Sequence, residues 1–296
     1  MKYAFTFFLL TALALGQSAP GPALGSAPNA DARASGQSSI PTEPENVKKA
    51  RAVLDLAIQA LGGQAYLNVL DVTQEGRSYS FHHGRSSGAG VTFTRTRKSW
   101  DEDRVDYTAS HEIDVDLIFG IEVPMGSSKT HVTLIYKGDQ GYEITNKGIR
   151  DLDTKDELEP YLRRRHFALE LVLRRWVNDP GAALFYEGQT VAAQKQTEQV
   201  TIMNAKNEAV TLNFDINTHL PVKKSFSWRD PADKERNVEE EIFDDYRQVQ
   251  GIMTPFGVTR TFNGDMSAQY FLNSTAYNRG VTDSLFDPKT ASIKQK

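Results

Sequence analysis

The sequence predicts an α+β, mainly β fold: a strongly curved antiparallel sheet, or half-open β-barrel, with helices packed on the concave face as a lid. Three observations support this fold class. Apolar and polar residues alternate in many segments, such as Val210–Ile216, as they do in strands with one buried face. Asn263-Gly264 indicates a tight hairpin, because a type I′ turn needs positive φ at both central residues. Only the segments 47–61 and 154–178 have helical periodicity, and a curved sheet needs such helices to bury its concave face.

The composition limits the kind of protein this can be. With 296 residues, the chain can form one large domain or two ordinary ones. A formal net charge of −4 indicates neither a polyanionic partner nor an acidic disordered tail. The chain has no cysteine, which excludes disulfides, thiolate metal sites and a cysteine nucleophile. We expect a single domain over 45–287, followed by a flexible tail at 288–296.

The N-terminal residues have the pattern of an export signal. Lys2 precedes an apolar run, 3–15, that is too short to span a bilayer, and Ala14-Leu15-Gly16 is a small-x-small cleavage site. Residues 17–44 are mostly Ala, Gly, Ser and Pro, the composition of a disordered linker. We therefore expect a signal peptide at 1–16, a linker at 17–44 and a periplasmic mature protein. No later stretch is long and apolar enough to be a transmembrane segment.

The first helix is expected to begin near Pro44. Its apolar residues are three or four apart, as in a helix with one buried stripe. Gly62-Gly63 ends it, because glycine adopts the left-handed C′ conformation without strain. Strands with turn signals between them follow, and the segment 113–123 alternates most regularly. The expected strand ranges are 72–82, 91–99, 103–110, 113–123, 131–137 and 141–146.

The segment 154–178 is the only long helical stretch inside the series of strands. Thr154 and Glu157 form a capping-box pair, whereas Pro160 suits the first turn of a helix that starts at the preceding residue. Both starts remain open. After this segment come a strand at 184–191 and a meander of antiparallel strands from about Gln199 to Tyr277.

Several segments occur in the order that is typical of one protein superfamily. The export signal is followed by a helix that ends in Leu61-Gly62-Gly63, by strands, by Phe214–Pro221 (FDINTHLP) and by Asp244–Phe262 (DDYRQVQGIMTPFGVTRTF). Over 45–287 the chain thereby resembles the periplasmic outer-membrane lipoprotein-sorting carriers of the LolA/LolB type, in particular their larger bacterial members. The resemblance implies a half-open barrel with a helical lid and an apolar cavity that shields acyl chains. The lid-locking arginine of these carriers cannot be assigned to a residue of this sequence.

The apolar stripe of the lid and nearby aromatic residues are the candidates for lining such a cavity. They are Leu162, Leu169, Val172, Trp176, Phe119 and Phe214.

Arg163, Arg164 and Arg165 lie on the other side of the same expected helix, and we expect them to face water. They form either a solvated face or a docking surface for anionic head groups or an acidic partner, because guanidinium groups bind phosphate bidentately.

The histidines are the candidates for a metal site. His82-His83, with His111, Asp114 and Asp116, contains the residue types that bind transition metals. Adjacent histidines on a strand point to opposite faces, however, and the carboxylates fit a solvated strand face. We expect no bound metal.

Carboxylates at Glu239–Glu241, Asp244 and Asp245 are numerous enough for acid–base chemistry. Their strand should pair with the strand that carries Lys223 and Lys224. Cross-strand Lys–Glu pairs on a solvent-exposed face, each worth about 0.2–1 kcal/mol, then account for these carboxylates without a catalytic role. No G-x-S-x-G, H-E-x-x-H or phosphate-loop motif is present. We expect neither an enzyme nor a cofactor.

Two hypotheses about function remain open. The first is a monomeric periplasmic binding protein that carries a lipid or lipoprotein acyl chain between sheet and lid, with envelope proteins as further partners. The second is a non-catalytic structural or interaction module of the cell envelope, whose own side chains fill the cavity. Neither involves nucleic acid, since aromatic residues are not interleaved with basic ones in a recognisable motif.

Overall fold

The computed structural model describes residues 44–82, 85–86, 90–108 and 131–293, which belong to one compact unit, Glu43–Lys296. The expected signal peptide at 1–16 and all but the last residue of the expected linker lie outside these residues. So does the expected strand 113–123, which contains the cavity candidate Phe119.

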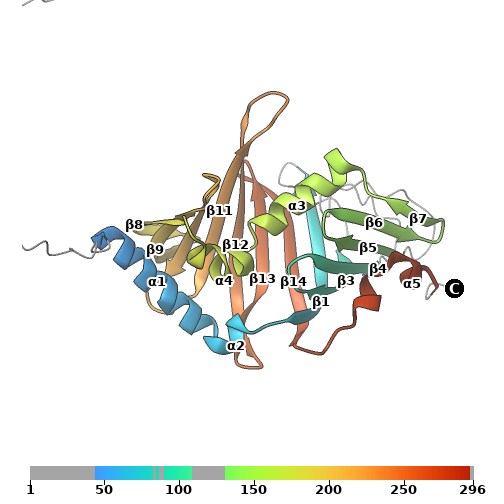
Figure 1. Cartoon of the computed structure of the whole chain (residues 1–296), viewed down its shortest axis with the longest axis horizontal. Coiled ribbons are helices and arrows are strands. Elements are labelled where there is room, and N and C mark those ends of the chain that lie inside the picture. The colour runs from blue at the N-terminus through green and yellow to red at the C-terminus, as the bar shows by residue number, and fades with distance from the viewer. Residues whose placement is uncertain (1–43, 83–84, 87–89, 109–130, 294–296) are drawn as a thin grey trace, which may run out of the picture. The chain divides into compact units, whose positions relative to one another are not determined.

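The described strands form one antiparallel sheet that is curved and not closed, as predicted (Figure 1). Their order across the sheet is β7-β6-β5-β4-β3-β1-β14-β13-β12-β11-β10-β9-β8, and the short β2 pairs with β1. At the centre the first strand pairs with the last, so that Val72 lies opposite Tyr277. The strands are β1 Asp71–His82, β2 Arg85–Ser86, β3 Val91–Lys98, β4 Glu102–Thr108, β5 His131–Lys137, β6 Gln140–Thr145, β7 Gly148–Asp151, β8 Ala183–Ala192, β9 Lys195–Met203, β10 Ala209–Asp215, β11 Pro221–Arg229, β12 Arg236–Val249, β13 Ile252–Phe262 and β14 Asp265–Tyr277.

The hairpin predicted at Asn263-Gly264 is confirmed. It joins β13 to β14, and both residues have positive φ, 49° and 90°. The strand β7 was not predicted, because its four residues are too short to show a period of two.

Three helices lie across one face of the sheet: α1 (Glu45–Leu61), α3 (Glu159–His166) and α4 (Leu169–Arg174) (Figure 1). Beneath α1 and α4 a large apolar cluster contains side chains such as Leu54, Leu173 and Leu212. Beneath α3 a second cluster joins Tyr161 to side chains of β3, β4 and β5. The helices thus cover the concave face as two separate packed regions.

The C-terminal residues depart from the expected flexible tail at 288–296. Pro288–Ile293 forms a helix, α5, in which Ala291 is 1 % exposed. Together with Phe286 it packs on Ile135 of β5 and Ile144 of β6. The neighbours of Ile135 along β5, Leu134 and Tyr136, belong to the cluster on the other face. An apolar patch on the outer side of β5 and β6 therefore holds this segment in place.

The lid segment, 154–178, is not one helix. A π-helical turn at Thr154–Leu158 leads into α3, and extended backbone at Ala168 (φ −60°, ψ 136°) separates α3 from α4. Both starts considered from the sequence occur, since Pro160 lies in the first turn of α3.

The capping residue of the lid segment is Asp153, not Thr154 as expected. The Asp153 carboxylate accepts hydrogen bonds from the backbone N–H groups of Lys155 and Asp156, each at 2.9 Å. Glu157 accepts one from the N–H of Asp153 (2.5 Å) and pairs with Arg150 (2.7 Å). The reciprocal pattern of a capping box is therefore present with Glu157 as predicted, but its cap is Asp153, one residue before Thr154.

The end of α1 approaches the turn between β12 and β13 closely. Gly62 (φ 126°) donates to Gln59 O and Gly63 (φ 55°) donates to Ile58 O. A Cβ atom on Gly62 would lie 2.5 Å from the carbonyl oxygen of Gly251, whereas one on Gly63 would meet only the end of the Gln59 side chain. Gly62 thus serves both the helix end and the contact of α1 with the sheet.

We expect Gly62→Ala to lower the free energy of unfolding by more than the roughly 1–2 kcal/mol that strain at positive φ costs. Gly148→Ala is the matched control, because Gly148 has nearly the same φ, 127°, and a Cβ added there would meet nothing within 4 Å. Urea denaturation of both variants gives the two losses in the free energy of unfolding. Their difference is the cost of the clash with Gly251, since the strain at positive φ is common to both. Equal losses would show that the contact with Gly251 contributes nothing.

Candidate functional site

A pocket of about 250 Å³ lies between the lid segment and the concave face of the sheet. Its walls come from α2 (Gln64–Leu67), from α3 and α4, and from the central strands β1, β3, β4 and β11–β14. The break between the two lid helices lies at this pocket, since Ala168 and Leu169 both line it.

The apolar walls come from both halves of the sheet. Val72, Phe93 and Val105 lie on one side, and Phe243, Ile252 and Val258 lie on the other. Six tyrosines add amphipathic surface: Tyr66, Tyr107, Tyr161, Tyr246, Tyr270 and Tyr277.

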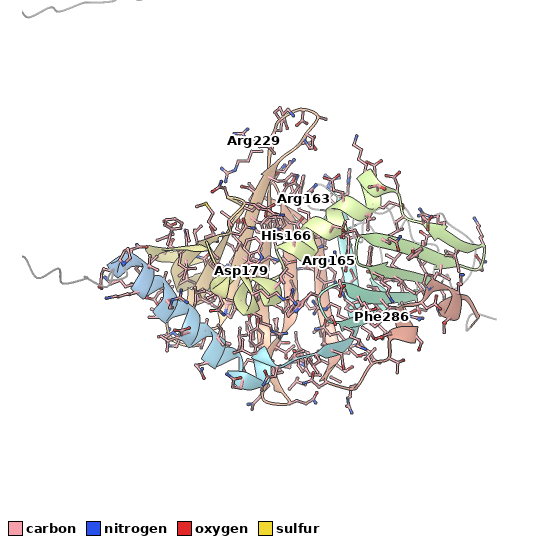
Figure 2. All side chains as sticks on the ribbon, in the orientation of Figure 1. Arg163, Arg165, His166, Asp179, Arg229 and Phe286 are labelled. Carbon is pink, nitrogen blue, oxygen red and sulfur yellow. The ribbon has the colours of Figure 1, made fainter. Side chains whose placement is uncertain are left out.

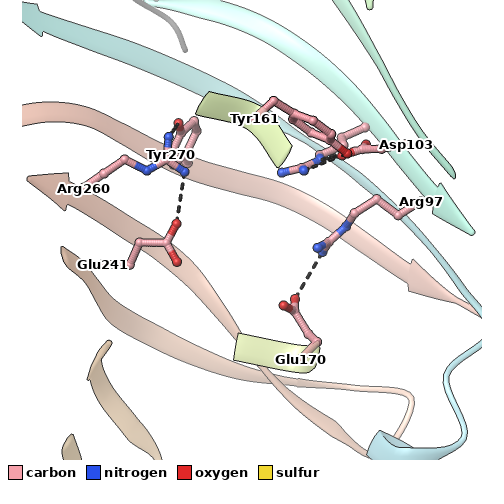
Figure 3. Close-up of polar contacts among 8 residues, drawn as sticks. Arg97, Asp103, Tyr161, Glu170, Glu241, Arg260 and Tyr270 are labelled. Atoms are coloured by element: carbon pink, nitrogen blue, oxygen red, sulfur yellow. Dashed lines mark hydrogen bonds and ion pairs between the residues drawn. The ribbon is translucent and has the colours of Figure 1, made fainter. Parts of the chain in front are cut away.

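The pocket is not apolar throughout, because a buried ion cluster lies on its sheet side. Lys224 Nζ on β11 lies 2.6 Å from Glu241 Oε2 on β12, and Arg260 Nη2 on β13 lies 3.0 Å from the other oxygen of that carboxylate. Arg260 also lies 3.2 Å from Glu239. It donates to the hydroxyl of Tyr270 at 2.9 Å, and Figure 3 shows Arg260 between Tyr270 and Glu241. Burial raises the pKa of Glu241, but the charges of Lys224 and Arg260 outweigh it and hold this pKa far below its usual range.

Further polar contacts link the lid to the sheet around the pocket. Tyr161 on α3 donates to Asp103 Oδ2 (3.0 Å), and Arg95 Nε donates to the other oxygen of that carboxylate (3.0 Å). Arg164 Nη1 lies 3.8 Å from Glu239 Oε2. Burial raises the pKa of Tyr161 well above its usual value, so its hydroxyl is a neutral hydrogen-bond donor.

The α4 side of the pocket contains two arginines and one carboxylate. Arg97 Nη2 on β3 lies 3.3 Å from Glu170 Oε1 (Figure 3). The Arg174 guanidinium lies over the ring of Tyr66 (4.3 Å) and near that of Trp100 (5.2 Å). Burial raises the pKa of Glu170, but the charge of Arg97 and, less strongly, that of Arg174 lower it, and the net pKa is below the usual value.

Positive charge exceeds negative charge in the pocket. Its described lining has seven Arg and Lys residues and five Asp and Glu residues. Two of the acids are used elsewhere: Asp71 accepts backbone N–H groups of residues 279–281, and Glu102 pairs with Lys137. The cations are Arg95, Arg97, Arg164, Arg165, Arg174, Lys224 and Arg260.

Of the cavity residues predicted from the sequence, Leu169 lines the pocket. Val172, Trp176 and Phe214 are buried in the cluster beneath α1 and α4, and Leu162 packs against the cluster beneath α3.

The three lid arginines do not share one environment. Figure 2 labels Arg163 and Arg165 on α3. Arg163 stacks on Trp228 at 4.2 Å, and Arg165 donates to the carbonyl of Gly138 at 2.7 Å. Arg164 lines the pocket, with only 15 % of its side chain exposed. Arg165 lines the pocket as well, and Arg163 and Arg165 keep only 20 % and 21 % of their side chains exposed, so the expectation that the three arginines face water is wrong.

The sequence predicted that the cross-strand Lys–Glu pairs lie on a solvent-exposed face, and this holds for only one of two adjacent pairs. Lys223 and Glu240, 2.9 Å apart, keep 26 % and 27 % of their side chains exposed. Lys224 and Glu241 lie on the opposite, buried face. A sequence signal existed, because Lys224 shares the apolar period of Val222 and Phe226.

Of the histidines and aspartates that were considered for a metal site, only His82 lies in the described part of the chain. Within this part, no group of three or more His, Asp or Glu side chains has a metal-binding arrangement. None of its helices combines the length and the apolar character that crossing a bilayer requires.

No protein-family model and no curated protein matches the chain. Among solved structures, it is similar to a DUF1329 family protein from Desulfovibrio piger, with a TM-score of 0.50 and 11 % identity over 81 % of this chain and 98 % of that one. A putative outer membrane lipoprotein-sorting protein domain from Vibrio parahaemolyticus matches with a TM-score of 0.48 and 11 % identity, over 82 % and 99 % of the two chains. A LolA superfamily protein from Nitrosomonas europaea matches with 0.46 and 11 %, over 81 % and 98 %. At 11 % identity, the similarity to the Desulfovibrio piger protein concerns the fold alone.

Proposed function

We propose that this chain is an exported, monomeric periplasmic binding protein that carries a lipid or lipoprotein acyl chain in the pocket beneath its lid. The observation that carries the proposal is the pocket itself, about 250 Å³ between the sheet and the break in the lid. Ligand pockets typically combine apolar walls with a few polar groups that fix orientation. The sequence resemblance to lipoprotein-sorting carriers and the expected export signal support the same function.

One observation favours the alternative, a non-catalytic structural or interaction module of the envelope. The cluster of Lys224, Glu241 and Arg260 occupies part of the concave face with the protein's own side chains. A module of this kind needs no ligand, and its concave face would be filled from within.

Native mass spectrometry of the protein recovered from the periplasm of an expressing bacterium separates the two functions. The denatured mass is expected to show cleavage within the first thirty residues, at a signal-peptide site. The native mass is expected to exceed it by the mass of one amphiphilic ligand.

A matched pair of variants tests whether that ligand lies in the pocket. Ala168→Phe places a ring in the pocket wall, and Ala205→Phe places one in the exposed turn before β10. We expect the first variant to lose the bound ligand and the second to keep it. An apo mass for the wild type, with full solubility, would favour the structural module.

A further inference from the structure

The α4 side of the pocket contains an excess of guanidinium groups. Arg97 comes from β3, and Glu170 and Arg174 lie one helical turn apart on α4. Glu170 is the carboxylate that contacts Arg97, at 3.3 Å. Arg174 makes a long hydrogen bond to the carbonyl of Val69 (3.5 Å) and is otherwise held by the rings of Tyr66 and Trp100. Among the described residues, Glu170 thus pairs with Arg97, and no carboxylate forms an ion pair with Arg174.

The donors of these arginines are incompletely used. A guanidinium has five N–H groups, and the Nε atoms of Arg97 and Arg174 are buried without a hydrogen-bond partner among the described residues. The side chains of Arg97 and Glu170 nevertheless keep 27 % and 33 % of their surface accessible, although both line the pocket. A second anion can therefore approach this group without unfolding the lid.

The electrostatic environment at this point favours a carboxylate. Burial alone would favour the neutral form of Glu170, yet its pKa lies below the usual value because Arg97, a backbone hydrogen bond and, less strongly, Arg174 favour the charged form. The low pKa of Glu170 therefore indicates that the electrostatic potential at this point also favours an anionic group of a ligand.

We propose that the pocket takes an amphiphile with a carboxylate or phosphate end group, and that this anionic end lies inward against Arg97 and Arg174. This inference rests on the proposed binding function and adds the chemistry of the ligand. Guanidinium groups bind carboxylate and phosphate through paired N–H···O bonds, which fix orientation as well as charge. The apolar walls, such as Val72, Phe243 and Val258, then receive the hydrocarbon chain. Without a ligand, the Glu170 carboxylate is the anionic group that pairs with Arg97.

The test uses two fluorescent probes with the same chain, dansylaminoundecanoic acid and its methyl ester. At neutral pH only the acid is charged. We expect the purified wild-type protein to bind the acid at least about tenfold more tightly than the ester, since hydrogen bonds to charged groups have this magnitude. Arg97→Gln is expected to weaken binding of the acid by roughly ten- to a hundredfold and to change binding of the ester less than about twofold.

Glu170→Gln is the second variant, and its expected effect has the opposite sign. It removes the carboxylate that competes for Arg97, so we expect the acid to bind more tightly than to the wild type. Arg247→Gln is the control with the same loss of charge, because Arg247 pairs with Asp245 away from the pocket. Circular dichroism shows that each variant is folded before the titration.

Competition against the bound acid probe distinguishes the source of the anion. Dodecyl phosphate is expected to displace the probe, and inorganic phosphate at the same concentration is not. Equal displacement by both would overturn the assignment to an amphiphile. Two results would overturn the proposal that the anionic end lies inward and leave the binding function intact. One is equal wild-type affinity for the acid and the ester. The other is an equal effect of Arg97→Gln and Arg247→Gln on binding of the acid. Saturable binding of neither probe would overturn the binding function itself.

Discussion

Glu241→Gln is expected to lower the free energy of unfolding by about 3–5 kcal/mol, the usual effect of breaking a buried ion pair from one side. The change keeps the size of the side chain but leaves Lys224 and Arg260 without their shared charge. Lys224 is 1 % exposed, so water cannot replace the lost partner. Urea denaturation of the wild type and the variant measures the difference.

The neighbouring pair is the control. Glu240→Gln removes the partner of Lys223 on the same two strands, but both side chains are about a quarter exposed. We expect a loss of at most about 1 kcal/mol, because surface ion pairs contribute little. Similar losses for the two variants would contradict the distinction between a buried and an exposed face.

The same carboxylate makes a contribution to stability that depends on pH. The pKa of Glu241 is lower in the folded protein than its ordinary value of about 4.3. Its contribution is complete above the ordinary pKa and is lost as pH falls through the folded pKa. The difference in stability between wild type and Glu241→Gln should therefore shrink as pH falls below about 4.

Trp176→Ala is expected to cost about 3–5 kcal/mol, as aromatic-to-alanine changes in a packed core do. Trp176 is 4 % exposed and packs on His166 (5.0 Å) and Phe167 (5.5 Å). It is not among the residues that line the pocket, so no vacant space reduces the number of contacts that are lost. Chemical denaturation checks the magnitude.

Trp228→Ala is the matched change at a half-buried tryptophan on β11. Its ring contacts Arg163 and lies 5.8 Å from Phe226, but the residue is only partly buried. We expect a clearly smaller loss than at Trp176. A loss at Trp176 no larger than at Trp228 would mean that Trp176 faces open space, as a residue of the cavity wall would.

The strands were predictable because alternation is a local property of the sequence. Segments such as Val210–Ile216 have one apolar face, and the structure buries Val210, Leu212 and Phe214 on that face. The turn at Asn263-Gly264 was predictable for the same reason, since its two residues determine its backbone conformation.

The charged side of the pocket was harder to predict, although the sequence contains a signal. Lys224, Glu241 and Arg260 each occupy a position on the apolar face of their strand, where a charge is unexpected. Burial of a charge is stable only with a partner on a neighbouring strand, and the pairing of strands is not local information. The cluster is visible in the sequence only after the strand register is known.

The lid shows a second limit of local patterns. Residues 154–178 have a continuous helical period, yet Ala168 is extended and two helices result. No glycine or proline marks the break. Its position depends on the two separate apolar clusters beneath α3 and α4, which are products of the whole sheet.

The pairing of β1 with β14 has a consequence for the order of folding. Most other neighbours in the sheet are close in the chain, so that their contacts can form early, whereas Val72 and Tyr277 must meet across a loop that contains nearly the whole domain. Contacts of this separation form slowly, because the entropy of closing the loop is lost before any contact compensates for it. The walls of the pocket come from both sides of this seam, with Arg97 on β3 and Glu241 on β12. We therefore expect the pocket, and with it the capacity to hold a ligand, to form only when β1 and β14 pair.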